Sequence, residues 1–450
     1  HSMEPITYTN IVVEGVPFTK VLALEIAHAI NEHGTAAIVG EMEVDAAREY
    51  LNRMDENAAI KITTTAEGQL SVLFYGLLTN VGVEQEAEYA TLTLTAATTS
   101  ALLDIQPVNR SYQKTSATYG QVMEAALNGT GAVNMKVTDQ ATGKMLVQCN
   151  ETNWAFCMRL ASMLNAPIFS EIDAVKPQIT VGLPGRGKVV DLSKSETKST
   201  KETVRVGTSI QTRQYMYLGS EISYHGIHQK VKALSCTMEK GVLLTTIEIA
   251  AEEKFVQQPI VNQQVSGKMY SGTVMAVQAD KVQVHITDID SSYDAGGDVW
   301  LPYSTAYSSG DGSGFYCMPA VGDTVRVFFP GTDEGSAFAA SSVCVSPGAK
   351  VTDKQWRGPN GKQILLTEEG IYITTNADDS KIFINLTDES GITISSNKDI
   401  SVCAKNNLSL MSNNNISITA EKDILISTAE SYIDMTPDGI EMGANNIVIK

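Results

Sequence analysis

The chain has 450 residues, of which 43% are hydrophobic and 19% are charged, and its formal net charge is −18. This length accommodates two to four domains with hydrophobic cores of their own. The acidic excess argues against nucleic-acid binding, since a phosphate-binding surface needs a basic excess. No stretch approaches the ~20 apolar residues of a membrane span. The longest candidate, from Val21 to Ile30, is short and contains Glu25 and His28.

The first residues and the cysteines indicate the compartment. His1, Ser2 and Met3 resemble a tag remnant before a native Met, and no signal peptide is recognisable. We therefore expect a protein that is made in the cytoplasm and keeps its thiols reduced. The six cysteines show no paired spacing; they are Cys149, Cys157, Cys236, Cys317, Cys344 and Cys403.

Residues 1–255 are expected to form one β-rich domain with a small α/β insert around 105–170. Apolar and polar residues alternate in several runs, which is typical of half-buried strands. The early runs predict one β-barrel-like part. Strands from about 174 to 251 predict a second such part, with a polar gap at 193–202. The early runs are 7–13, 35–44, 59–65, 70–83 and 89–97.

The α/β insert contains two predicted helices, 118–127 and 151–164, whose apolar residues recur at helical spacing. Trp154 and Phe156 are expected to be core residues of the second helix. A buried charge needs a partner, so Arg159 is expected to anchor a nearby carboxylate such as Glu151 at the helix start.

Residues 262–347 predict a small all-β module, followed by a linker at 348–361. Five short strands separated by Gly-rich turns are typical of a Greek-key barrel of the OB type. The predicted strands are 267–278, 281–286, 297–303, 324–329 and 336–343.

A period of eight residues dominates the end of the chain. Each repeat begins with a large apolar residue, carries a second hydrophobe two residues later in nearly every unit, and has a small residue four residues later. Turn-forming residues such as Gly391, Asp399 and Asn407 stand just before the repeats. The first positions are Ile392, Ile400, Leu408, Ile416, Ile424, Tyr432 and Ile440; the second are Ile394, Val402, Leu410, Ile418, Ile426 and Met442; the small residues are Ser396, Ala404, Ser412, Ala420, Thr428, Thr436 and Ala444.

This repeat predicts how residues 362–450 are built. An extended eight-residue unit spans roughly 26 Å, too short to travel around a single-chain coil, which needs about 20 residues or more. One strand and one corner cover one face of a prism, so three chains would close it without an open edge. The alternative is an ordinary antiparallel sheet of short strands. Asp434 breaks the second position, and a register shift through Ile433 and Met435 is left open there.

Three segments resemble the VgrG and phage tail hub-and-spike family, the central spikes of contractile injection systems. The first is an E-T-x-W-x-F-x-x-R-L-A segment, the second a P-x-x-G-D-x-V-x-V strand, and the third the octads from Ile392 onward. The residues that match the first segment are Glu151, Thr152, Trp154, Phe156 and Arg159. Those that match the second are Pro319, Gly322, Asp323, Val325 and Val327.

The resemblance implies a mainly β protein: a hub of β-barrel-like domains, an OB-fold, and a C-terminal trimeric intertwined β-helix. The homotrimer would cap a hexameric tail tube, contact baseplate proteins and pierce the target envelope. About 15 residues, 346–360, separate the OB module from the repeats, so the lysozyme domain of some phage relatives does not fit there. The end lacks the His-x-His pairs of self-capped spikes, so a separate PAAR-like tip protein is expected. Type VI secretion, phage tails and tailocins all remain open.

No catalytic, cofactor or metal site is predicted. His225 and His228 are the one close histidine pair, and a third ligand is not evident. The acidic loop from Asp288 to Asp298 lacks the spacing of an EF-hand and reads as a solvated barrel loop. The rival interpretation is a secreted β-helical carbohydrate-binding or carbohydrate-processing protein, which would need a secretion signal and a groove lined with aromatic or acidic residues.

Overall fold

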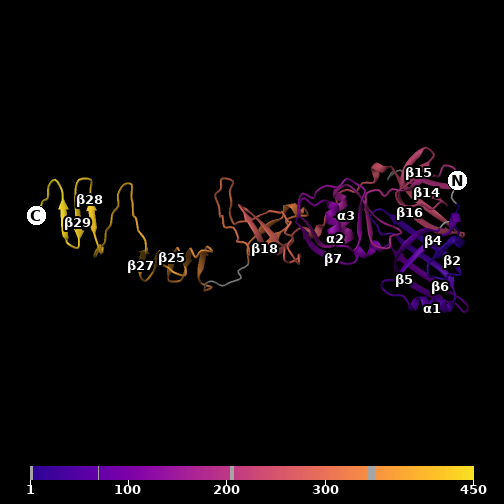
Figure 1. Cartoon of the computed structure of the whole chain (residues 1–450), viewed down its shortest axis with the longest axis horizontal. Helices are drawn as coiled ribbons and strands as arrows, with labels where there is room; N and C mark the ends of the chain where they lie inside the picture. Colours follow the sequence, from indigo (N-terminus) through magenta and orange to yellow (C-terminus); the bar gives the residue numbers. More distant parts are fainter. Residues whose placement is uncertain (1–3, 69, 203–206, 343–349) are drawn as a thin grey trace. The chain divides into compact units, whose positions relative to one another are not determined.

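The computed structural model describes residues 4–68, 70–202, 207–342 and 350–450. The chain divides into two compact units, His1–Val343 and Cys344–Lys450. Both are built mostly of β-strands, with few helices (Figure 1). None of the helices among the described residues is long and apolar enough to cross a membrane.

The first unit is organised around a twelve-stranded sheet with the order β1-β4-β5-β6-β3-β2-β16-β17-β14-β13; β15 pairs with β16 and with β12. The strict alternation of Thr and Leu or Ala in β6 points one side chain in two into the core, as expected for a half-buried strand. The strands are β1 (Ile11–Val13), β2 (Lys20–Ala29), β3 (Thr35–Met42), β4 (Ala59–Thr64), β5 (Ser71–Gln85), β6 (Ala90–Ala97), β12 (Arg186–Asp191), β13 (Thr197–Glu202), β14 (Gly207–Thr212), β15 (Ser220–Tyr224), β16 (Ile227–Glu239) and β17 (Val242–Ala250).

The two β-rich parts expected from the sequence are joined in this single sheet. β2 pairs with β16 in antiparallel register, with Ala29 opposite Ala233 and Glu25 opposite Thr237. One hydrophobic cluster then runs through both parts and includes Ile38, from β3, and Ile247, from β17. The hydrogen-bonded ladder and the shared core therefore hold the parts together as one body.

Three elements of this sheet region differ from the sequence-based expectation. The apolar run at 21–30 is strand β2, and the strand expected to reach residue 44 ends at Met42 and gives way to helix α1 (Val44–Asn52). The polar gap expected at 193–202 was wrong, because residues 197–202 form β13. β13 lies at the edge of the sheet with most of its side chains in solvent, so it needs no apolar alternation.

The inserted α/β part packs two helices, α2 (Tyr119–Leu127) and α3 (Asn153–Met163), into a second hydrophobic cluster. The Thr118 hydroxyl accepts a hydrogen bond from the amide of Gln121 and caps α2. Asn128 ends the helix in the left-handed conformation. Two small sheets flank the helices: β7 (Pro107–Tyr112) with β9 (Leu146–Thr152), and β10 (Ile168–Ser170), β11 (Gln178–Val181) and β8 (Ala132–Met135).

A five-stranded antiparallel sheet in the order β20-β19-β18-β21-β22 completes the first unit. Its third hydrophobic cluster combines OB-module residues with Val147 and Cys149 from β9, so the module packs directly on the α/β insert. Five predicted strands correspond to β18 (Met269–Gln278), β19 (Lys281–His285), β20 (Leu301–Pro302), β21 (Thr324–Phe328) and β22 (Phe338–Ala340).

The second unit contains a five-stranded antiparallel meander followed by repeats and a three-stranded meander. β23 falls in the segment expected as a linker, where Trp356 pairs with Ile364. The strands are β23 (Lys354–Arg357), β24 (Gln363–Leu366), β25 (Gly370–Thr374), β26 (Phe383–Thr387), β27 (Gly391–Ser395), β28 (Ile424–Ser427), β29 (Tyr432–Thr436) and β30 (Gly439–Gly443).

Candidate functional site

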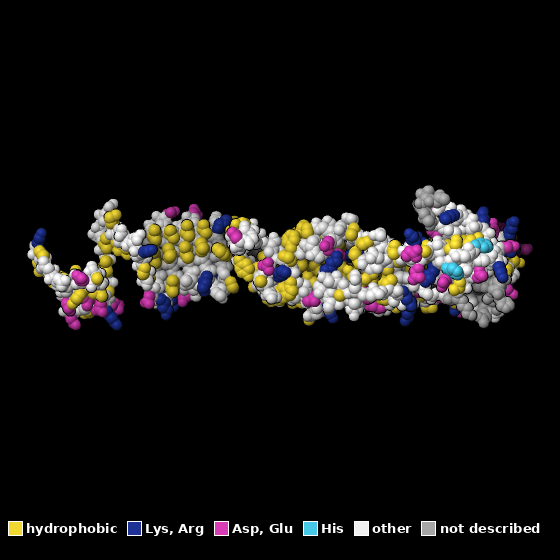
Figure 2. All heavy atoms as spheres, turned by 90° about the horizontal axis from the view of Figure 1, so that it is seen from above, with side chains coloured by type: hydrophobic (Ala, Val, Ile, Leu, Met, Phe, Trp, Pro, Cys, Tyr) yellow, Lys and Arg dark blue, Asp and Glu magenta, His cyan; other side chains and the backbone are white. Residues whose placement is uncertain are grey.

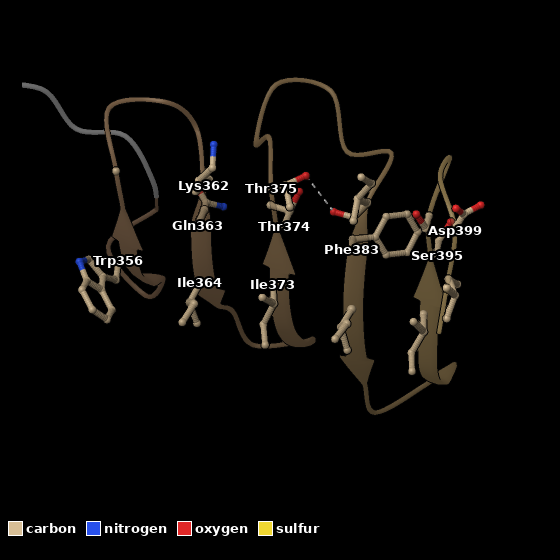
Figure 3. Close-up of a pocket in the computed structure, with 16 residues that line it drawn as sticks. Trp356, Lys362, Gln363, Ile364, Ile373, Thr374, Thr375, Phe383, Ser395 and Asp399 are labelled. Carbon is tan, nitrogen blue, oxygen red and sulfur yellow. Dashed lines mark hydrogen bonds between the residues drawn. The ribbon is translucent and has the colours of Figure 1, made fainter. Parts of the chain in front are cut away.

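Large apolar side chains form two straight columns across the meander β23–β27. Strand pairing places Trp356, Ile364, Ile373, Ile384 and Ile394 opposite one another from strand to strand. Figure 3 shows the first three of these residues side by side on successive strands. The second column runs beside it through Leu366, Ile371, Leu386 and Ile392.

In these strands the large apolar side chains are exposed and the residues between them are half-buried, the opposite of an ordinary globular sheet. The nine column residues are between 37% and 71% exposed, whereas the residues between them, such as Tyr372 and Asn385, are half-buried. Rows of hydrophobic side chains therefore lie open on this face (Figure 2). A contiguous apolar surface of this kind marks an interaction site in a soluble protein.

A groove of about 660 Å³ lies along the first column and is the most apolar of the pockets described. Its walls include Trp356, Ile364, Ile384 and Ile400, so the meander and the first following repeat share it. The groove holds no cluster of His, Cys, Asp or Glu that suits a metal, and none occurs elsewhere in the described part of the chain. Its chemistry is that of apolar packing.

The octads predicted from the sequence are visible as corners every eight residues. Bends occur at 397–398, 405–406, 413–414, 421–422 and 429–430, and a turn follows at 437–438. Figure 1 shows the chain running to and fro between them. The described residues between 396 and 423 form no paired strand within the single chain, and their apolar residues are exposed. These residues are Ile400, Val402, Leu408, Leu410, Ile416 and Ile418.

The small residue at the fifth position of the octads stands just before each corner. The Ser396 hydroxyl accepts a hydrogen bond of 3.0 Å from the amide of Lys398, and Ser412 accepts one of 3.2 Å from the amide of Asn414. Such a hydroxyl satisfies a main-chain donor that the bend would otherwise leave unpaired. At Ser396 and Ser412 the small side chain therefore has a local function in turning the chain.

The octad register shifts by one residue at Asp434. In β29 the residues that pair with the apolar positions of β28 and β30 are Ile433 and Met435. Tyr432, the residue at the regular octad position, instead lies on the other face, where its hydroxyl donates to Glu441 at 2.5 Å. The apolar set at this end is Ile424, Ile426, Ile433, Met435, Ile440 and Met442.

The hub segment that carries the family resemblance forms a buried polar anchor. Nε and Nη2 of Arg159 donate to the two carboxylate oxygens of Glu151 at 2.9 Å each, and Nη1 donates to Oε1 of Glu334 at 2.6 Å. Arg159 is only 3% exposed. Burial raises the pKa of the Glu151 carboxyl, against the stabilising bonds from Arg159. The expected Arg159–Glu151 pair is confirmed, and Glu334 of the OB module is its additional partner.

The other residues of this segment also have structural contacts. The Thr152 hydroxyl caps α3 by accepting from the amide of Ala155 at 3.1 Å, and it donates to Asp104 at 2.6 Å. Trp154 is buried with its ring 4.1 Å from that of His33, and Phe156 is fully buried. None of these contacts leaves a reactive group facing a pocket.

The acidic loop of the OB module accepts hydrogen bonds from the α/β insert. Asp290 accepts hydrogen bonds from the amide and the hydroxyl of Ser111, and Asp298 accepts from the amide and the hydroxyl of Thr115 at 2.8 and 2.9 Å. Asp288 accepts from the amide of Ser271. Asp290 and Asp298 therefore clamp two parts of the first unit together, whereas Asp288 acts within the OB module.

The predicted OB strand has a packing role. Val325 and Val327 are fully buried in the module core. Asp323 accepts from the amide of Ala320 at 2.7 Å, and Gly322 adopts a φ of 94°, which a glycine supplies without strain, so the turn before β21 is fixed. Pro319 stands at the entry of this turn.

Three hydrogen-bonded side chains, those of Ser100, His33 and Asp104, resemble a hydrolytic triad. No sequence pattern predicted this arrangement. Nδ1 of His33 lies 2.7 Å from the Ser100 hydroxyl, and Nε2 lies 2.9 Å from the Asp104 carboxylate. Ser100 is 1% exposed and also bonds Thr98, so a substrate has no access to it. This arrangement joins the β2–β3 turn to the segment before β7. His225 lies in the tight turn between β15 and β16 with a φ of 47°. Among the described residues it belongs to no group of side chains that could hold a metal ion.

Comparison with known proteins gives one match to a family model. Residues 270–343 match the type VI secretion system/phage-baseplate injector OB domain. No curated protein matches this sequence.

Solved structures match over most of the chain. The Escherichia coli c3393 protein, described as a component of the type VI secretion system with structural similarity to T4 bacteriophage tail proteins gp27 and gp5, is 13% identical, with a TM-score of 0.54 over 74% of this chain and 99% of that one. The half-lidded Francisella PdpA–VgrG complex is 8% identical, with a TM-score of 0.53 over 86% of this chain and 87% of that one. Residues 270–343 are thus similar to the injector OB domain of type VI secretion systems and phage baseplates, and the chain has a VgrG-like fold.

Proposed function

We propose that three copies of this chain form the central spike of a contractile injection system and pierce a target envelope mechanically. The observation that carries this proposal is the uncovered apolar face of the C-terminal unit. Its two columns and the octads that follow present large aliphatic residues to solvent in a single chain. A partner of the same pattern covers them most simply, because each strand then meets an identical strand.

The energy of such a trimer favours a stiff rod. Each octad contributes about two large apolar side chains per chain and hence six per layer. At ~1.5–3 kcal/mol for each buried aliphatic side chain, one layer gains on the order of 10 kcal/mol before chain entropy. Layers of repeats add through nearest-neighbour contacts. A narrow rod that resists unfolding suits penetration.

The first unit would form the hub at the front of a tail tube. Its VgrG-like fold supports contact with a hexameric tube protein and with baseplate proteins. The buried Arg159–Glu151–Glu334 contact and the Asp290 and Asp298 clamps support a hub and OB module that move as one rigid body. A force applied along the axis to the hub would then be transmitted to the OB module, because no hinge between them would bend and absorb it.

The working particle would be a tail or baseplate assembly of type VI, phage or tailocin type, assembled in the cytoplasm. A separate PAAR-like tip protein would cap the C-terminal end of the rod. The chain's contribution is mechanical and involves no catalysis or bound cofactor.

Light scattering coupled to size exclusion tests the proposal. We expect a mass near three times 48.4 kDa for the full chain. A monodisperse monomer at micromolar concentration would refute the spike assignment.

A further inference from the structure

The segment between β20 and β21 is poor in charge and rich in exposed aromatic residues. In this segment, residues 303–323, two charged side chains occur, Asp311 and Asp323, although 19% of the whole chain is charged. Tyr307 is 52% exposed, Phe315 60% and Tyr316 74%. Part of this segment projects as a narrow loop from the module that contains β18 (Figure 1). Such a cluster on a highly acidic protein indicates an interaction surface.

Hydrogen bonds close this loop as a hairpin. The amide of Phe315 donates to the carbonyl of Tyr307 at 2.8 Å, and the amide of Ser309 donates to the carbonyl of Ser313 at 2.8 Å. The Thr305 hydroxyl closes the base by donating to the carbonyl of Phe315 at 2.7 Å. Because the backbone is already fixed, little conformational entropy is lost when the aromatic residues meet a partner.

The polar ends of the tyrosines are already occupied within the module. The hydroxyl of Tyr316 donates to the carbonyl of Ala279 at 2.9 Å, in the turn between β18 and β19. The hydroxyl of Tyr307 lies 3.1 Å from that of Ser313. What these side chains leave to solvent is therefore chiefly ring surface, which favours an apolar contact.

Part of the usual ligand site of an OB-fold is occupied by the chain itself. OB-folds bind oligonucleotides and oligosaccharides through the face of strands 2–3 and adjoining loops. Here the loop after β19 holds Ser111 and Thr115 through Asp290 and Asp298, and the loop before β22 holds Arg159 through Glu334. The aromatic hairpin lies outside these contacts and remains uncovered.

We propose that the hairpin packs against the OB module of a second copy of this chain; this rests on the trimer of the proposed function and adds a second contact to it. Each copy carries a net charge of −18, so three copies repel one another unless they meet through uncharged surface. Aromatic residues supply much of the energy of such contacts.

The receiving surface on the second copy follows from what else the module exposes. Among its described residues, the large hydrophobic side chains exposed outside the hairpin are Met269 and Met275 on β18, together with Val321. Methionine sulfur makes favourable contacts with aromatic rings. In a closed three-fold ring the hairpin of each copy would meet these methionines on the next.

The experiment uses the full chain with the photoreactive residue benzoylphenylalanine in place of Tyr316. Irradiation is expected to yield a product of two chains, linked to the peptide that contains Met269 or Met275. In parallel, the combined variant Tyr307→Ser, Phe315→Ser and Tyr316→Ser is expected to dissociate at a protein concentration at least tenfold higher than wild type. The control Tyr89→Ser, at another exposed tyrosine, should leave dissociation unchanged.

The outcomes separate this inference from the proposed function. A wild-type monomer would overturn both. A wild-type trimer whose dissociation is unaffected by the combined variant, with no link between chains, would overturn the hairpin contact and leave the spike intact. Unchanged trimer dissociation together with lost binding to peptidoglycan sacculi would make the hairpin a saccharide platform and equally overturn the contact.

Discussion

Asp290 accepts two hydrogen bonds from Ser111, one from its amide and one from its hydroxyl, although 179 residues separate them in the chain. Asp298 holds Thr115 in the same way. Each carboxylate satisfies a main-chain donor and a side-chain donor together, so the OB module and the strand that leads into α2 are fixed to each other at two points.

Replacing Asp290 by Ala should loosen this junction. Hydrogen bonds to a charged acceptor contribute about 1.5–3 kcal/mol each, so we expect the free energy of unfolding to fall by about 1.5–3 kcal/mol in total, with water replacing part of the loss. Urea unfolding measures this. Asp294→Ala is the matched control, since Asp294 caps only Gly296 in its own loop. Equal unfolding midpoints for the two variants would contradict the clamp.

Replacing Arg159 by Met should be more damaging. The substitution leaves Glu151 and Glu334 buried near each other without their shared cation, and removal of one partner from a buried pair costs about 3–5 kcal/mol. Thermal unfolding of the full chain should show the first unit melting at a lower temperature. Asp333→Asn removes an exposed partner of Lys144 instead and should change the midpoint little. A wild-type midpoint for Arg159→Met would show that the ion cluster is not needed.

Buried His28 predicts a loss of stability in mild acid. Burial lowers the pKa of His28 from 6.5 to about 4, while its Nε2 lies 2.7 Å from the carbonyl of Ser170. The unfolded chain therefore takes up a proton between these values and the folded chain does not, so stability is complete above pH 6.5 and falls as the pH drops to about 4. At 1.36 kcal/mol per pKa unit the loss is about 3 kcal/mol.

The measurement for His28 is urea unfolding at a series of pH values. His28→Gln keeps a donor for Ser170 and removes the titrating group, so its stability should fall less steeply than that of wild type between pH 6.5 and 4. Parallel curves for the two proteins would rule out His28 as a source of the acid sensitivity.

The octad core predicts different outcomes at neighbouring positions. Ile416→Asp places a carboxylate among the apolar residues that the proposed trimer would bury, and it should abolish trimer formation. Asn414→Ala changes a corner residue that bonds Ser412 through its main-chain N–H and not through its side chain. This variant should leave the trimer intact. Sedimentation velocity measures both. Identical profiles for the two variants and wild type would refute burial of the octads.

The register shift at Asp434 can be tested in the same way. Ile433→Asp alters the apolar face described for β29 and should dissociate the trimer as Ile416→Asp does. Tyr432→Phe removes only the hydroxyl that bonds Glu441 and should be tolerated. A trimer that survives Ile433→Asp would contradict the shifted register.

Alternation of apolar and polar residues predicted the OB strands, and the eight-residue period with its turn-forming residues predicted the corners. It failed where a strand has no buried face or where an element is short. β13 is an edge strand of mostly exposed polar residues, and α1 buries only Ala47 and Tyr50. The column residues Ile364, Ile371 and Ile384 were missed because the loop at 375–382 interrupts the eight-residue spacing, although the pairs at i and i+2 were a usable signal.

Long-range polar contacts were predictable only where the sequence brings the partners together. Arg159 and Glu151 are eight residues apart on one helix and the strand before it, so their pairing could be predicted. Glu334 and Asp290 meet their partners only through the packing of the OB module on the insert, and no local pattern encodes that.

The inverted burial of the meander β23–β27 has a kinetic consequence. In the trimer proposed above, a newly synthesised chain would expose this apolar sheet surface until it meets two further copies, so completion of the C-terminal unit would be an association step whose rate rises with the concentration of chains. Dilution during refolding would then slow this association and prolong the exposure of the apolar face, whereas neighbouring synthesis on one messenger RNA would shorten the exposed interval.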